Sequence, residues 1–199
     1  MVQYKDDSFL MWDSINILST LPPKFEREVV ISYSPHLRIS QVHISGKEYI
    51  LRWLWFNHGQ EDFNLQCELM SKINHPNIER QVRFFKHGDN FRGVLTQYVD
   101  GQEASPKNWQ TALHLKSLKD ATLYLHSINI VHNDISPKNI MIGRDGTLVL
   151  IDFDSATYTG CQNAYRRGTT GWHKTEQYGS QDGDLEVIDR IDKRLSGKS

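Results

Sequence analysis

The first half of the chain alternates between β-rich and helical patterning. Short runs of β-branched and aromatic residues, bounded by turn residues, predict strands. Five such runs occur, at Val29–Ile31, Leu37–Ser45, Tyr49–Phe56, Gln81–Phe85 and Arg92–Val99. Between the third and fourth runs, residues 60–73 carry the apolar period of a helix, which should end before Pro76 because proline disfavours helix at the preceding residue. This half is predicted to be a small sheet with one helix.

The second half is patterned mainly for helices, placed around two short apolar runs. Two stretches have amphipathic helical periods, 109–127 and 184–195. Between them lie the apolar runs 130–142 and 148–154, separated by the turn sequence Gly143–Gly146. Residues 155–175 resemble a polar loop, and Asp100–Gln102 break the pattern between the halves, where we expect a hinge.

Three polar side chains are tied to the predicted hairpin. Asp134 and Asn139 are five residues apart in the first run, and Asp152 lies thirteen residues beyond Asn139. Because the turn brings the two runs together, we expect these side chains to converge at one end of a small sheet. Hard Mg²⁺ takes one or two protein oxygens and leaves its other positions to phosphate and water. The pattern predicts chemistry on a magnesium-bound polyphosphate, with a carboxylate that orients the attacking hydroxyl.

Length, charge and cysteine content limit the domain size, the partners and the compartment that we expect. A length of 199 residues suits one domain, or two small lobes that share a cleft. The formal net charge of −1 gives no reason to expect nucleic acid or a membrane as a partner. Cys67 and Cys161 fit no metal or redox spacing and are expected to be free thiols. No apolar run reaches the roughly 20 residues of a membrane span and the N-terminus lacks a signal peptide, so the cytosol or nucleus is expected.

The stretch around these side chains resembles the catalytic loop and metal-binding motif of protein kinases. The family pattern is His-Arg-Asp, four residues, Asn, and then Asp-Phe-Gly. Here it reads His132-Asn133-Asp134, then Asn139, then Asp152-Phe153-Asp154. Asn133 departs from Arg and Asp154 departs from Gly. The sequence His75–Ile78 after the first predicted helix adds to the resemblance, which is strongest to small, divergent fungal-type protein-kinase-like domains.

The resemblance implies an α+β, two-lobed protein kinase-like fold over roughly residues 29–195. A small lobe at about 29–99 would be β-rich with one helix, and a large lobe at about 100–199 would be mainly helical. Residues 1–28 would form an N-terminal extension, possessing at most a short helix. Since the family is usually longer, the large lobe is expected to be truncated, with its C-terminal helices missing.

Roles in the large lobe follow from the same resemblance. Asp134 would be the catalytic base or would orient the acceptor hydroxyl, and Asn139 and Asp152 would hold Mg²⁺ against the ATP phosphates. Ser136 stands among the catalytic residues where many serine/threonine kinases carry a lysine that contacts the γ-phosphate. Asn133 has no charge, so a phosphorylated activation loop could not pair with it. Either that loop is ordered constitutively or it is not a switch.

The activation segment is expected at Gly168–Glu176, which resembles the end of a kinase activation loop. Thr169 would contact the catalytic aspartate and shape the groove for a protein substrate, and Glu176 matches the closing glutamate of the motif. Asp184 would accept backbone N–H bonds from the loop around His132.

The nucleotide side departs more from the family. The residues expected at ATP are Arg52, Gln66, Gln97, Val99 and Asp152. Arg52 stands where the family has a lysine for the α- and β-phosphates, with Lys47 as an alternative cation and a plain strand-end arginine as the other reading. Gln66 falls where the partner glutamate is expected on the helix, and Asp62 and Glu68 lie nearby. Ser32–Arg38 occupies the place of the glycine-rich loop without a glycine, which argues for weak ATP affinity.

Three functions remain open at this level. The first is an ATP- and Mg²⁺-dependent kinase acting on Ser or Thr of a protein substrate. The second is a pseudokinase that scaffolds a protein partner. The third is a small-molecule phosphotransferase of the aminoglycoside or choline kinase type, which shares the His-x-Asp motif but lacks a segment like Gly168–Glu176.

Overall fold

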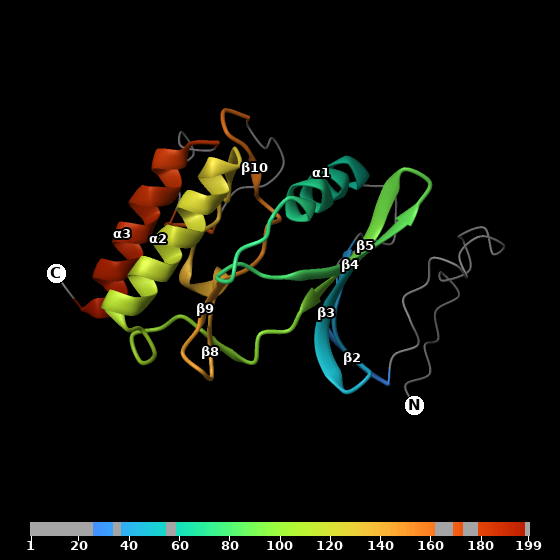
Figure 1. Ribbon diagram of the computed structural model, residues 1–199, viewed down its shortest axis with the longest axis horizontal. Coiled ribbons are helices and arrows are strands. Elements are labelled where there is room, and N and C mark those ends of the chain that lie inside the picture. Colours follow the sequence, from blue (N-terminus) through green and yellow to red (C-terminus); the bar gives the residue numbers. More distant parts are fainter. Residues whose placement is uncertain (1–25, 34–36, 55–58, 162–168, 173–178, 198–199) are drawn as a thin grey trace.

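The computed structural model describes residues 26–33, 37–54, 59–161, 169–172 and 179–197. In Figure 1 a β-sheet occupies the right-hand part of the molecule, and two long helices lie side by side at the left. A third helix lies between the sheet and this pair of helices. The α+β class with a β-rich first part and a helical second part, predicted from the patterning, is confirmed. No helix in the described ranges combines the length and the apolar character needed to cross a membrane.

The first part is a five-stranded antiparallel sheet with one helix. Its strands are β1 (Arg27–Tyr33), β2 (Leu37–Ile44), β3 (Lys47–Leu54), β4 (Gln81–His87) and β5 (Asn90–Gln97), in the spatial order β1-β2-β3-β5-β4. The helix α1 (Gln60–Ser71) packs against β4 and β5. All five strands and the helix were predicted, and β1 begins two residues before the predicted start of the small lobe at residue 29.

The hairpin between β2 and β3 has the turn that its sequence predicts. Ile44 pairs with Lys47, so only Ser45 and Gly46 form the loop. Their φ angles are 49° and 75°. Two consecutive left-handed residues match the twist of the flanking strands, which explains a glycine at the second position.

The second part consists of two helices and short strands. Its elements are β6 (Gly101–Glu103), α2 (Thr111–Ser127), β7 (Ile130–Val131), the 3-10 helix η3 (Pro137–Asn139), β8 (Ile140–Gly143), β9 (Leu148–Leu150), β10 (Thr157–Tyr158) and α3 (Gln181–Ser196). One small sheet has the order β6-β8-β9, and β7 pairs with β10. The predicted hairpin is therefore present as β8 and β9, joined through Gly143–Gly146.

Two boundaries differ from the sequence-based expectation. The connection between the parts is residues 98–100, because Gly101 already begins β6, which pairs with β8. A Cβ atom on Gly101 would lie 2.2 Å from the carbonyl oxygen of Ile142, so this pairing requires glycine. The supposed polar loop after residue 154 also begins with the short strand β10, since Thr157 and Tyr158 pair with β7.

A single hydrophobic core joins the two parts. It includes Leu54 and Leu69 from the first part and Leu118, Phe153 and Ile188 from the second, all buried. A second, smaller cluster on the sheet contains Val42, Leu51, Phe85 and Leu95. Because the larger core crosses the junction, the position of Phe153 and its neighbours is fixed by packing from both sides.

Candidate active site

The loop at residues 132–139, here called the catalytic loop, is held by a buried aspartate on α3. The carboxylate of Asp184 accepts the backbone N–H groups of His132, at 2.9 Å, and of Asn133, at 3.0 Å. His126 Nε2 lies 3.1 Å from the same carboxylate. Asp184 stands in the first turn of α3, which Ser180 caps through the backbone N–H of Gly183. The sequence-based prediction that Asp184 accepts N–H bonds from this loop is confirmed.

Asp134 is the only carboxylate of the catalytic loop, and both of its oxygens are occupied. The side-chain amide of Asn139 donates to Asp134 Oδ2 at 2.9 Å and to its backbone carbonyl at 2.8 Å. The backbone N–H of Thr169 donates to Asp134 Oδ1. The hydroxyls of Ser136 and Thr169 are 3.4 Å apart. The structure thus brings four of the predicted residues together, including the expected contact between Thr169 and Asp134.

Asp152 lies beside this group because β8 and β9 pair. The backbone N–H of Ile151 donates to the carbonyl of Asn139 at 2.9 Å, so the next residue, Asp152, follows directly at the same end of the small sheet. Asp152 has a φ of 67°, which is unusual for a residue with a side chain. His132 steadies the turn, since its Nε2 atom lies 3.2 Å from the carbonyl of Ile151 and its ring packs on Phe153.

The side-chain oxygens of Asn139 and Asp152 are suitable ligands for a magnesium ion. Asn139 uses its amide N–H groups on Asp134, which leaves its side-chain carbonyl oxygen. The Asp152 carboxylate accepts one long hydrogen bond, of 3.4 Å, from the backbone N–H of Asp154. Two hard oxygens are the number that Mg²⁺ takes from protein when phosphate supplies others. No cluster of three or more His, Cys, Asp or Glu side chains suited to a metal occurs in the described ranges.

Arg52 on β3 forms a buried ion pair that the sequence did not indicate. Its Nη1 atom lies 3.0 Å from Oε2 of Glu79, and the two residues are 6% and 4% exposed. Burial alone lowers the pKa of Arg52, but the carboxylates of Glu79, Asp152 and Asp154 outweigh it and raise the pKa further above its usual value. Arg52 is therefore fully charged beside Asp152.

Among the hydrogen bonds of the described residues, none joins Gln66 to Arg52, although counting along the helix suggested that pairing. The amide of Gln66 donates to Oδ1 of Asp154 instead. Glu68, the nearby alternative, is exposed and bonds to Lys72 and Tyr158. Among the described residues, no hydrogen bond joins Arg52 to a carboxylate of α1. Sequence reasoning missed Glu79, whose only signal is an acidic residue next to the buried Ile78.

Asn133 is buried and makes three hydrogen bonds through its side chain. Its amide donates to the carbonyl of Ser155 and to the hydroxyl of Thr157, both at 3.0 Å, and its oxygen accepts the backbone N–H of Gly179 at 2.9 Å. A φ of 63° suits asparagine better than most residues. Asn133 therefore ties the catalytic loop to the segment after the metal motif and to the segment before α3, without any charge.

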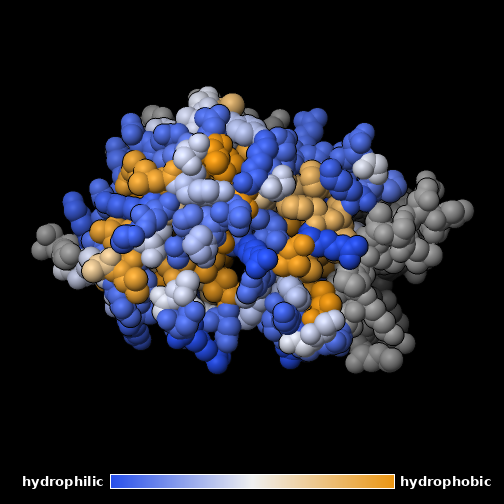
Figure 2. Space-filling view, viewed as in Figure 1, coloured by the Kyte–Doolittle hydropathy of each residue, from blue (hydrophilic) through white to orange (hydrophobic). Residues whose placement is uncertain are grey.

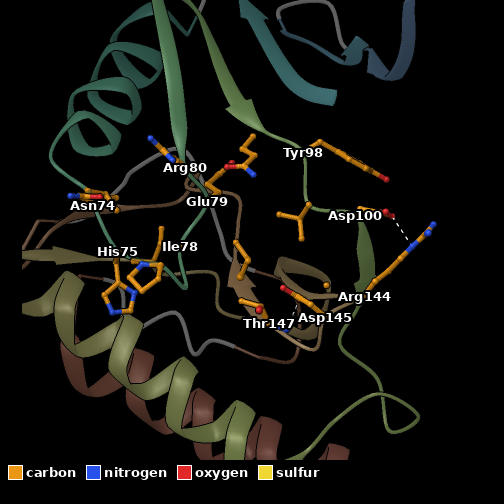
Figure 3. A pocket seen from close by; sticks show the side chains of 16 residues that line it. Asn74, His75, Ile78, Glu79, Arg80, Tyr98, Asp100, Arg144, Asp145 and Thr147 are labelled. Carbon is orange, nitrogen blue, oxygen red and sulfur yellow. Dashed lines mark hydrogen bonds and ion pairs between the residues drawn. The ribbon is translucent and has the colours of Figure 1, made fainter. Parts of the chain in front are cut away.

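A separate cavity of about 720 Å³ lies at the junction of the two parts (Figure 3). Its lining comes from residues 73–80, from the connection 97–100 and from the β8–β9 hairpin. The space-filling view shows the surface hollowed near the middle of the face drawn in Figure 1, between scattered hydrophobic patches (Figure 2). Gln97 and Val99 line this cavity, whereas Asp134, Asn139 and Asp152 do not. The nucleotide role of Gln97 and Val99 stays a prediction.

Some predicted positions lie outside the described residues. These are Gly168 and residues 173–176, including Glu176, of the predicted activation segment, residues 34–36 in the connection between β1 and β2, and residues 1–25 of the predicted N-terminal extension. Their roles stay predictions.

Comparison with known proteins identifies what the catalytic loop and its surroundings are similar to. The sequence model of the family described as the protein kinase domain matches residues 56–183. The chain is 31% identical over 122 residues to Aurora kinase A-A of Xenopus laevis, a match that covers 57% of this chain and 27% of that protein. It is 28% identical over 113 residues to an Aurora kinase of Encephalitozoon cuniculi, covering 53% of this chain and 40% of that protein. It is 34% identical over 101 residues to serine/threonine-protein kinase PLK4 of Drosophila grimshawi, covering 46% and 13%. The matched stretch spans less than half the length of each relative.

Proposed function

Since the chain belongs to the protein kinase family, we propose that it transfers the γ-phosphoryl group of ATP to a serine or threonine side chain of a protein. The observation that carries this proposal is the fixed carboxylate of Asp134, held by Asn139 and Thr169 beside Asp152. A hydroxyl acceptor is supported by the similarity to a protein named a serine/threonine-protein kinase. The catalytic domain would span residues 29–199, with the lobes meeting near residue 99.

Asp134 would orient the acceptor hydroxyl and take its proton. Its two carboxylate oxygens accept N–H groups of Asn139 and Thr169, so its position does not depend on the substrate. A pre-positioned carboxylate lowers the barrier because no reorganisation is needed when the hydroxyl arrives. Since Thr169 belongs to the activation segment, its bond to Asp134 favours a protein kinase over a small-molecule phosphotransferase.

Asn139, Asp152 and Arg52 would hold the other reactant. Mg²⁺ and ATP, when bound, supply the transferable phosphoryl group and neutralise charge that develops on its oxygens. Asn139 and Asp152 would offer their side-chain oxygens to the ion. The guanidinium of Arg52 has one hydrogen bond to the described residues, the one to Glu79, so most of its five N–H donors remain for phosphate oxygens. Ser136 offers a hydroxyl but no charge where the family often has lysine.

A pseudokinase is the second candidate, and one observation favours it. No glycine occurs in Ser32–Arg38, the stretch expected to approach the phosphates. This feature lowers the expected affinity for ATP. Under this reading the chain would bind a protein partner without transferring phosphate.

The test is phosphoryl transfer from γ-labelled Mg-ATP to a generic protein substrate and to the chain itself. Asp134→Ala and Asp152→Ala should abolish the signal, whereas Asp89→Ala, in the exposed turn between β4 and β5, should not. Equal labelling by all four proteins would contradict the kinase proposal. A thermal shift with Mg-ATP separates the alternatives, since a kinase should be stabilised by the nucleotide and a nucleotide-free pseudokinase should not.

A further inference from the structure

Glu79 occupies the point where the two parts of the molecule are joined by backbone pairing. Its own N–H donates to the carbonyl of Leu150 at 2.9 Å, and the preceding Ile78 forms a parallel bridge with Leu150. Leu150 ends β9, two residues before Asp152. The backbone of Glu79 is therefore fixed to β9, which leads into Asp152, and Glu79 is only 4% exposed.

Each carboxylate oxygen of Glu79 contacts a different part of the proposed site. Oε2 accepts from Nη1 of Arg52 at 3.0 Å, and Oε1 accepts from the backbone N–H of Asp152 at 2.9 Å. One side chain thus links the cation on β3 with the acid proposed for magnesium. We propose that Glu79 is the positioning residue of this site, because it fixes the side chain of Arg52 and the backbone of Asp152 relative to each other.

Glu79 would take the role of counter-ion to the strand cation, which protein kinases usually give to a glutamate of their first long helix. In that family the strand lysine pairs with a glutamate of the helix, and the position of the helix controls activity. Here the helix position expected for the acid holds Gln66, whose amide contacts Asp154. Glu68 faces solvent and pairs with Lys72. The counter-ion of Arg52 therefore comes from the segment attached to β9, so a displacement of α1 would leave the Arg52–Glu79 pair intact.

The burial of Arg52 and the two N–H donors explain why position 79 needs a charged carboxylate. A buried guanidinium without a counter-ion is strongly unfavourable, because desolvation is not repaid by water. Asp152 has a left-handed backbone, and its N–H bond to Glu79 holds that conformation. Glu79→Gln keeps the shape but removes the charge and leaves one acceptor oxygen for two donors. Glu79→Asp keeps the charge on a side chain that is one methylene shorter.

The inference rests on the proposed kinase activity, so its test needs one readout of catalysis and one of structure. Steady-state transfer in Glu79→Gln should show the KM for Mg-ATP raised by about tenfold or more, from the loss of a hydrogen bond to a charged group. The kcat should fall by a smaller factor. Glu61→Gln, a matched control at an exposed position of α1, should change the KM by less than about threefold. Glu79→Asp should lie between wild type and Glu79→Gln.

The structural readout is amide hydrogen exchange of the peptide that contains Asp152. In Glu79→Gln the exchange of that peptide should accelerate by about tenfold, since its N–H loses a charged acceptor. In Glu61→Gln it should be unchanged, because Glu61 is exposed on α1. Unchanged exchange in Glu79→Gln, or an equal effect of Glu61→Gln, would overturn the positioning role. If the wild type neither binds nor turns over Mg-ATP, the kinase proposal fails and the exchange result still decides the role of Glu79. Should Glu79→Gln not fold, Glu79→Asp provides the same comparison.

Discussion

The side-chain oxygen of Asn133 accepts the backbone N–H of Gly179 at 2.9 Å, which ties the catalytic loop to the residues that precede α3. The same side chain donates to Ser155 and Thr157. Protein kinases that carry arginine here use its charge to order a phosphorylated activation loop. In this chain a neutral amide makes the connection with three hydrogen bonds. Both alternatives raised by the sequence, a constitutively ordered loop and a loop that is not a switch, stay predictions, because residues 162–168 and 173–178 lie outside the described residues.

Asn133→Ala should lower the free energy of unfolding by about 2–3 kcal/mol, because it leaves a buried N–H, a carbonyl and a hydroxyl without their partner. Asn129→Ala is the matched control. Asn129 has a similar φ of 65° but an exposed side chain, so its substitution should cost only the backbone strain of about 1 kcal/mol. Urea unfolding of both variants measures the difference. Equal losses would mean that the three side-chain bonds contribute nothing.

Asp184→Asn should destabilise the chain by about 2–4 kcal/mol, since the amide group would face an N–H donor at the catalytic loop. Asp184 accepts from both His132 and Asn133, and asparagine offers one acceptor oxygen. Asp182→Asn, on the exposed side of the same helical turn, should change stability by less than about 0.5 kcal/mol. Denaturant midpoints with unchanged m-values test this pair, and a similar shift for both would count against the role of Asp184.

Replacing one partner of the Arg52–Glu79 pair should cost more than replacing both. Arg52→Met and Glu79→Met each leave a buried charge and should lower stability by about 3–5 kcal/mol. The double variant removes both charges and should lose only about 1–3 kcal/mol, the cost of leaving the N–H of Asp152 without its acceptor. Thermal or urea unfolding of the four proteins gives the coupling energy. Additive losses would show that the two side chains do not depend on each other. The double variant should nevertheless lose stabilisation by Mg-ATP, because the phosphate cation is gone.

The two cysteines should differ in reactivity. Burial raises the pKa of Cys67 to about 12, so almost no thiolate exists at pH 8. The thiol of Cys161 is exposed. A colorimetric thiol reagent at pH 8 should therefore modify one cysteine per folded chain and two after denaturation. Rapid modification of both in the folded protein would contradict the burial of Cys67 on the inner side of α1.

Local patterns were sufficient to predict the fold class and the proximity of Asp134, Asn139 and Asp152, whereas their roles stay predictions. The hairpin that joins β8 and β9 follows from two apolar runs and a glycine-bounded turn, so Asn139 and Asp152 had to meet. The spacing of Asp134 and Asn139 within one short loop likewise leaves little freedom. The contact of Asp184 with the catalytic loop was predicted from the resemblance to protein kinases, which placed Asp184 at the start of the last predicted helix.

Partners that depend on long-range packing were not predictable. Arg52 and Glu79 are 27 residues apart and come from different segments, so counting along α1 indicated Gln66 instead. The role of Asn133 was also hidden, because two of its three partners are backbone groups of residues 155 and 179, which carry no sequence signal. The strand β6 was missed because three residues paired through a glycine resemble a loop.

The most direct test of the account is the rate of phosphoryl transfer by Asp134→Asn, which keeps the shape of the side chain and removes its basicity. With saturating Mg-ATP, kcat should fall by about 100-fold or more, as expected when a general base is lost, while the Mg-ATP thermal shift is retained. Asp89→Asn should leave kcat unchanged. A wild-type rate matched by Asp134→Asn would contradict the proposal that Asp134 orients and deprotonates the acceptor hydroxyl.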